Sequence, residues 1–170
     1  MAVEMTARAQ WIRDTKPCTP PPFVDTAEWR PARLPDGEAA NALLPPGFVF
    51  DSTTRFFHGG VQWRRGRQVF ARMRGWFGLG NSTACRLPLG GQSYIVSVQT
   101  DSGGVSLFAV PADTIGGESE GLYAASPRVD DVDLLWAILR SATPICDRYL
   151  LGKGAEAISP NDPCPDTKNR

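Results

Sequence analysis

Residue types that could perform nucleophilic catalysis are sparse in this chain. His58 is the single histidine, so a serine or cysteine nucleophile that needs an imidazole base would have to use it. Ser82 and Cys85 are nearby in sequence, but no Asp or Glu lies between Ser52 and Thr100 to orient such a base. We therefore predict that the protein is not an enzyme.

Patterns that bind cofactors or metal ions are equally sparse. The glycines between Gly75 and Gly91 lack the spacing of a dinucleotide-binding or phosphate-binding loop, so they predict turns and bulges. The four cysteines include no pair separated by two residues, which a structural zinc site would usually contain. Asp130 and Asp131 form a carboxylate pair that the start of a helix explains. We expect neither a cofactor nor a metal ion.

The cysteines instead predict disulfide bonds. Cys18 and Cys164 lie in proline-rich segments, where buried free thiols are not expected, and an even number of cysteines fits an oxidising compartment. Three connectivities are possible. We favour Cys85 with Cys146, which would join the sheet to the end of a helix, and Cys18 with Cys164, which would tie the two termini together. Four reduced thiols in a cytosolic protein are the alternative.

Positive charge is concentrated in the middle of the chain. Lysine plus arginine (18) balance aspartate plus glutamate (18), so nothing global directs the protein to nucleic acid or to an anionic membrane. Residues 52–100, however, carry seven arginines and no acidic residue, which leaves a charge of +7 there and −7 in the remainder. Either this block meets a partner with an acidic face, or acidic residues from the flanking segments neutralise it.

The arginines lie mainly on a predicted β-hairpin, with one arm at Val61–Arg65, a tight turn at Gly66 and a second arm at Gln68–Phe77. Side chains alternate across a strand, so one face of the second arm is predicted as core, with Val69, Ala71, Met73 and Phe77. The other face combines arginine with aromatic residues, a composition that favours a protein interface. A second packed layer beneath a helix is the alternative. The predicted partner-binding residues are Trp63, Arg64, Arg65, Arg67, Phe70, Arg72, Arg74 and Trp76.

The remaining patterns predict an α+β fold, in which an antiparallel sheet is packed by a C-terminal helix. The helix begins with a cap at Asp130 and stops at Pro144. Residues 116–121 predict a mobile acidic loop. The further predicted strands are an edge strand at Glu28–Leu34, a turn and short strand at Leu44–Phe50, a hairpin formed by Ser93–Thr100 and Val105–Val110, and a short last strand at Leu122–Ala125.

The domain is expected to span residues 28–143, between two extended proline-rich tails. Residues 1–27 would form an N-terminal arm and linker, with a short helix at Val3–Arg13, and residues 144–170 a C-terminal tail. No apolar run approaches the roughly 18 residues that a membrane-spanning helix needs. The first residues also lack the apolar region of a signal peptide, which conflicts with the disulfide interpretation.

The order of segments between Leu44 and Ala142 resembles the PsbP-like family of extrinsic photosystem subunits and related small bacterial lipoprotein domains. The segments that carry this resemblance are LPPGFVF, FHGGVQW, RGRQVFARMRGWFG, CRLPLGG, SYIVSVQT, LFAVP and DLLWAILRS. The resemblance implies an antiparallel sheet flanked by helices. It also implies a non-enzymatic subunit on the lumenal or periplasmic face of a membrane complex, such as one of photosynthesis.

These observations favour an accessory or scaffold subunit that docks on the extracytoplasmic face of a larger complex, most simply a membrane complex, through a partner with an acidic face. The periplasm or another extracytoplasmic compartment is the expected location. An inhibitor or immunity-type binding protein is one alternative. A nucleic-acid-binding sheet is another, with Trp63, Phe70 and Trp76 as stacking platforms, but the neutral net charge makes nucleic acid the less favoured partner.

Overall fold

A computed structural model describes residues 14–19, 24–35, 39–52, 60–76, 83–89, 91–112 and 118–142. The predicted helix at Val3–Arg13 and the predicted tail at residues 144–170 lie outside this part of the chain.

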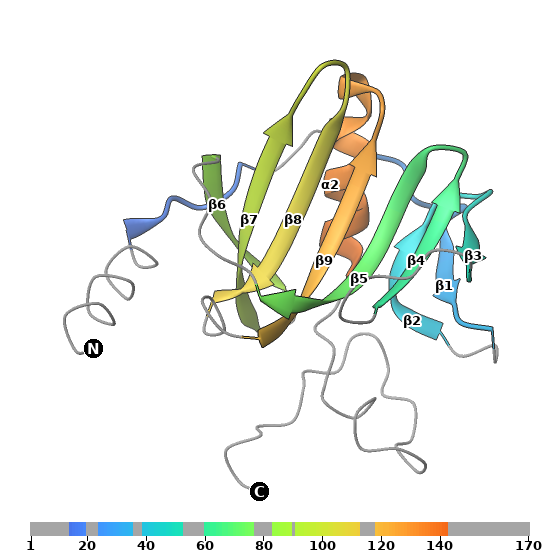
Figure 1. Cartoon of the computed structure of the whole chain (residues 1–170), viewed down its shortest axis with the longest axis horizontal. Coiled ribbons are helices and arrows are strands. Elements are labelled where there is room, and N and C mark those ends of the chain that lie inside the picture. Colours follow the sequence, from blue (N-terminus) through green and yellow to red (C-terminus); the bar gives the residue numbers. More distant parts are fainter. Residues whose placement is uncertain are drawn as a thin grey trace, which may run out of the picture.

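The main element is a seven-stranded antiparallel sheet (Figure 1). The last of the described strands along the chain, β9, lies between β5 and β8 and joins the two halves of the sheet. In spatial order the strands are β3 (Val49–Asp51), β4 (Gly60–Arg65), β5 (Gln68–Trp76), β9 (Glu118–Ser126), β8 (Val105–Pro111), β7 (Gln92–Thr100) and β6 (Thr83–Leu89).

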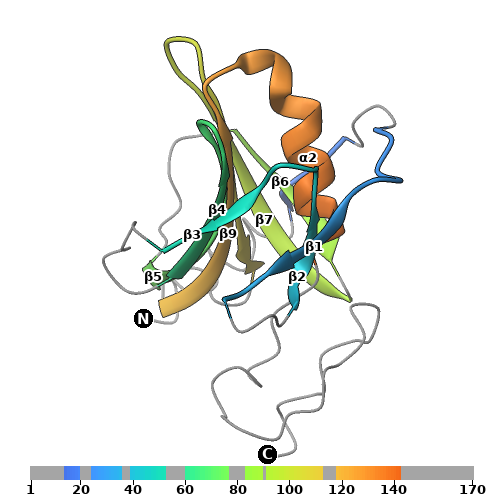
Figure 2. The same cartoon turned by 90° about the vertical axis from the view of Figure 1, so that its right-hand side faces the viewer.

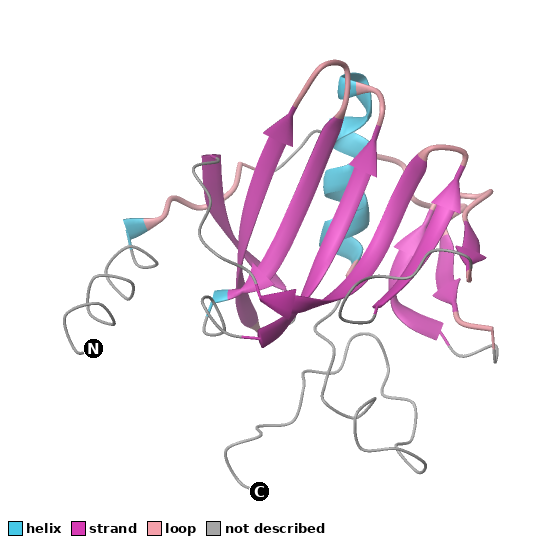
Figure 3. Cartoon of the chain, in the orientation of Figure 1, coloured by secondary structure: helices cyan, strands magenta, loops and turns pink. Residues whose placement is uncertain are grey.

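One face of the sheet is covered by helix α2 (Val132–Ser141) and by a separate two-stranded sheet formed by β1 (Arg30–Arg33) and β2 (Ala39–Leu44) (Figure 2). A single turn of 3₁₀-helix, η2 (Val129–Asp131), leads from β9 into α2. Figure 3 shows how far strands outweigh helix in the described residues. Ser141 connects the β1–β2 hairpin to the helix, because its hydroxyl oxygen accepts a 2.9 Å hydrogen bond from the Leu43 amide while its proton is donated to the Ile138 carbonyl oxygen of α2.

The core lies between the sheet and this covering layer. On α2, Leu135, Ile138 and Leu139 are completely buried and follow the three- and four-residue spacing of one helix face. They meet residues of the central strands, including Leu107, Leu122 and Ala124. Burial of each large aliphatic side chain favours folding by about 2 kcal/mol, so this contact is the main reason that helix and sheet stay together.

The predicted α+β architecture is confirmed. Both predicted hairpins are present, as β4–β5 and β7–β8, and the short strand predicted before Asp51 is β3. The edge strand predicted near Pro31 is β1, which pairs with β2 and not with the main sheet. No helix in the described residues has the length and apolar character needed to cross a membrane.

Two parts of the secondary-structure prediction are wrong. Residues 118–121, predicted within a mobile acidic loop, belong to β9 and pair with β5, where Glu120 is the register partner of Arg74. The helix begins one residue later than predicted, with Asp131 at its N-cap, and no side chain caps it by a hydrogen bond. Strands β2 and β6 were not predicted. Pro88 argues against a strand, but it is accommodated because β6 lies at the edge of the sheet.

Candidate binding surface on the β4–β5 hairpin

The two aromatic residues at the centre of the predicted surface are core residues. Trp63 and Phe70 are register partners, with exposed fractions of 1% and 0%, and their ring centroids lie 5.7 Å apart. The Trp63 indole Nε1–H donates a 2.8 Å hydrogen bond to the Arg33 carbonyl oxygen in β1. The prediction that these two residues face a partner is therefore wrong, and the alternative of a packed layer holds for Phe70.

The side chain of Arg72 is also buried. It follows Phe70 by two residues in β5, so both side chains point to the face that α2 and the β1–β2 hairpin cover. The exposed fraction of Arg72 is 6%, and its Nε and Nη2 atoms are shielded from solvent. A partner could not reach this guanidinium without a rearrangement of the core.

The guanidinium of Arg65 makes hydrogen bonds within the protein. Its Nε donates a 2.7 Å hydrogen bond to Oε1 of Gln68, and its Nη1 donates a 3.1 Å bond to the carbonyl oxygen of Pro46. The guanidinium carbon also lies 5.1 Å from the centroid of the Phe48 ring, within the range of a cation–π contact. Arg65 thus fastens the β2–β3 connection to the hairpin, which explains why only part of its side chain is exposed.

The same network continues from Gln68 to the start of the helix. Gln68 Nε2 donates a 2.9 Å hydrogen bond to Oδ2 of Asp131, and Ser126 Oγ donates a 2.5 Å bond to the same oxygen. Burial raises the pKa of Asp131, but these two hydrogen bonds and the nearby charges of Arg128 and Arg65 outweigh it, so that the pKa is lowered from its ordinary value. The carboxylate therefore joins β5, β9 and α2 in its charged form.

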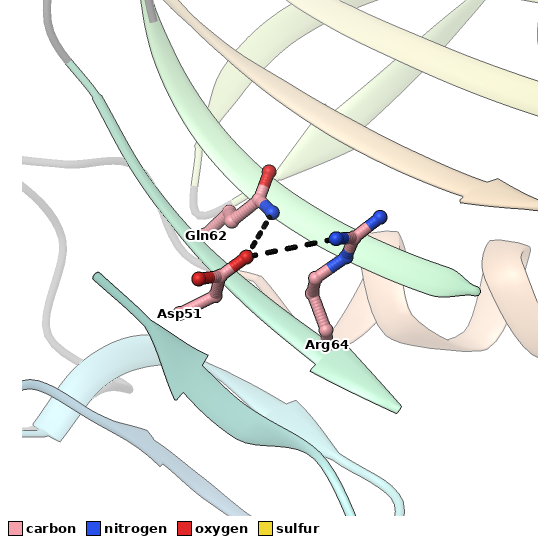
Figure 4. A network of polar contacts seen from close by, with 3 residues as sticks. All are labelled: Asp51, Gln62 and Arg64. Atoms are coloured by element: carbon pink, nitrogen blue, oxygen red, sulfur yellow. Dashed lines mark hydrogen bonds and ion pairs between the residues drawn. The ribbon is translucent and has the colours of Figure 1, made fainter. Parts of the chain in front are cut away.

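Arg64 is the arginine of β4 that faces solvent on the side of the sheet opposite α2 (Figure 4). Its Nη1 lies 3.7 Å from Oδ2 of Asp51, which also accepts a 2.8 Å hydrogen bond from Gln62 Nε2. The Arg64 side chain is 45% exposed. A guanidinium has five N–H donors, so one long ion pair leaves most of them directed at water and able to meet a partner.

Next to Arg64 lies an exposed apolar side chain that the sequence did not single out. Val49 is the register partner of Arg64 and is 65% exposed, the largest value among the exposed large hydrophobic residues of the described chain. Arg67 is exposed in the turn between β4 and β5. We call these three residues, Val49, Arg64 and Arg67, the hairpin patch. They lie at the β3 side of the sheet, where β3 has no second neighbouring strand among the described residues.

The backbone of β5 places Arg74 opposite Glu120 and Trp76 opposite Glu118; the side chains of Arg74 and Trp76 lie outside the described part of the structure. Among the described side chains, acidic residues from the flanking segments approach arginines of the basic block at two points, through Asp51 beside Arg64 and Asp131 near Arg65. Neutralisation by flanking acidic residues, the alternative to an acidic partner, therefore accounts for part of the charge asymmetry. Arg64 and Arg67 are the exposed arginines of the block among those whose side chains are described.

The disulfide in the described residues joins Cys18 to Cys85, so both favoured pairings are wrong. Each of them used one of these two cysteines with a different partner. The physical reason is that residues 16–18 run along β6, which places Cys18 beside Cys85. Cys146 and Cys164 lie outside the described residues. Cys85 is bonded and offers no free thiol for catalysis, and His58 and Ser82 lie outside the described residues.

Within the described ranges, no group of three or more His, Cys, Asp or Glu side chains is arranged to hold a metal ion. Comparisons with protein-family models, with curated proteins and with solved structures find no match to the chain. The resemblance to the PsbP-like family therefore stays a prediction.

Proposed function

We propose that the chain is a non-enzymatic accessory subunit that docks on a larger extracytoplasmic protein complex through the hairpin patch. The observation that carries the proposal is the pairing of an exposed apolar residue, Val49, with an exposed cation, Arg64, at one edge of the sheet. Arginine beside apolar surface is typical of protein interfaces. The partner that fits has a carboxylate to pair with the guanidinium and an apolar side chain to cover Val49.

The disulfide supports the proposed extracytoplasmic compartment. Disulfide bonds persist in the periplasm and in other oxidising compartments and are rare in the cytosol, so Cys18–Cys85 supports an extracytoplasmic location. A membrane complex, including one of photosynthesis, is proposed as the partner on the grounds of the PsbP-like resemblance alone.

The structure weakens the nucleic-acid alternative. Two of its three stacking platforms, Trp63 and Phe70, are buried and cannot stack on bases without opening the core. An inhibitor or immunity-type protein would use the same patch, and the identity of the partner separates it from an accessory subunit.

The test is capture of a partner from gently solubilised membranes by the wild type and by an Arg64→Glu, Arg67→Glu double variant. We expect the wild type to retain a defined complex that the double variant loses, because carboxylates on the patch repel an acidic partner. The matched control is Arg30→Glu with Arg140→Glu, which makes the same change of charge at two exposed positions that do not belong to the hairpin patch. Equal capture by both double variants, or no defined complex with the wild type, contradicts the proposal.

A further inference from the structure

The outer edge of β6 is occupied by the chain's own N-terminal segment. Pro17 forms a parallel bridge with Arg86, in contrast to the antiparallel pairings of the main sheet. The Cys18 amide donates a 2.8 Å hydrogen bond to the Arg86 carbonyl oxygen, and the Arg86 amide donates a 2.8 Å bond to the Lys16 carbonyl oxygen. We call residues 16–18 the strap. Its contact with Arg86 is that of a short strand added to the edge of a sheet.

The strap is held by a covalent bond at the same point. Cys85 precedes Arg86 in β6 and is bonded to Cys18, and both cysteines are partly buried against the core. Two backbone hydrogen bonds alone exchange readily for bonds to water, so their net contribution to attachment is small. The disulfide is therefore the feature that keeps the strap in place.

We propose that the strap is a redox-sensitive cover of the β6 edge, released from Arg86 when thiol–disulfide exchange reduces the Cys18–Cys85 bond. The reductant is a dithiol. One of its thiolates attacks a sulfur of the Cys18–Cys85 bond and releases the other cysteine as a thiolate, and its second thiol then resolves the mixed disulfide. Both cysteines end as thiols and the dithiol as a disulfide, so two electrons are transferred. This inference does not depend on the hairpin patch, which lies at the other end of the sheet.

Amide hydrogen exchange of the oxidised and the dithiol-reduced protein, resolved by NMR, tests the opening. We expect the amides of Cys18 and Arg86 to exchange about tenfold faster or more after reduction, as in a local opening, and the amides of β8 to keep their protection. A Cys18→Ser, Cys85→Ser double variant should behave like the reduced protein. Unchanged exchange at Arg86 overturns the proposal, because the strap would then stay without the disulfide. Equal loss of protection in β8 also overturns it, because the bond would then hold the whole sheet.

Discussion

At the scale of single residues, burial and hydrogen bonds within the protein determine which arginine side chains remain able to contact a partner. Arg64 and Arg65 are adjacent in β4, yet alternation directs Arg64 to the face opposite α2 and Arg65 to the face that α2 covers. Arg64 keeps donors for a partner, whereas Arg65 uses its donors on Gln68 and Pro46. Composition groups these residues together, and only the structure separates them.

The burial of Phe70 gives a direct mutational test. Phe70→Ala should lower the free energy of unfolding by about 3–5 kcal/mol, because it removes a fully buried ring and leaves a cavity. The exposed Arg67→Ala should change it by less than about 0.5 kcal/mol. Urea denaturation of both variants measures the difference. A small effect of Phe70→Ala would contradict its place in the core.

Asp131 should make stability depend on pH. Its pKa is lowered in the folded protein, so the stabilisation that it provides is present above its unfolded pKa of about 3.9 and is lost as the pH falls toward the folded value. Asp131→Asn should therefore be less stable than the wild type at pH 7 and should lose less stability in acid. Urea denaturation across this range tests both statements. Asp130→Asn, an exposed neighbour, is the control, and parallel curves for the wild type and Asp131→Asn would contradict the assignment.

At the scale of elements, local patterns predicted the two hairpins and the helix. Strict alternation and turn residues specify β4–β5 and β7–β8, and the spacing of apolar residues specifies α2. Alternation also divides β5 correctly into two faces. It could not show that α2 and the β1–β2 hairpin, which are distant in sequence, cover the face that carries Phe70 and Arg72. A prediction from alternation alone therefore places the interface on a face where the structure buries Phe70 and Arg72.

The elements that were missed depend on distant partners. The acidic residues before Gly121 are typical of a loop. They form a strand because each of residues 118–121 has a register partner in β5. Pro88 and the flanking glycines argue against a strand at β6. The strand forms because β7 pairs with it along its whole length. The disulfide could not be predicted for the same reason, since the position of Cys18 beside Cys85 depends on the strap and not on sequence spacing.

At the scale of the whole molecule, the two edge strands of the sheet, β6 and β3, differ in what covers their outer edges. An open sheet edge invites pairing with other chains, and here β6 is closed by the strap, which a disulfide holds. At the other end, β3 is only three residues long and carries the exposed Val49 beside Arg64. The molecule thus has one edge that the strap closes, which we propose reduction opens, and another edge at β3, where we propose that a partner docks.

The Cys18–Cys85 bond and the strap that it holds should both be present in the protein as it occurs in its native compartment. A non-reducing peptide map of protein isolated from its source, with all free thiols blocked at lysis, detects this bond. We expect a peptide that contains Cys18 linked to one that contains Cys85, and neither cysteine carrying the blocking reagent. Recovery of both cysteines as blocked thiols would show that the bond is absent, and it would also remove the support for an extracytoplasmic location.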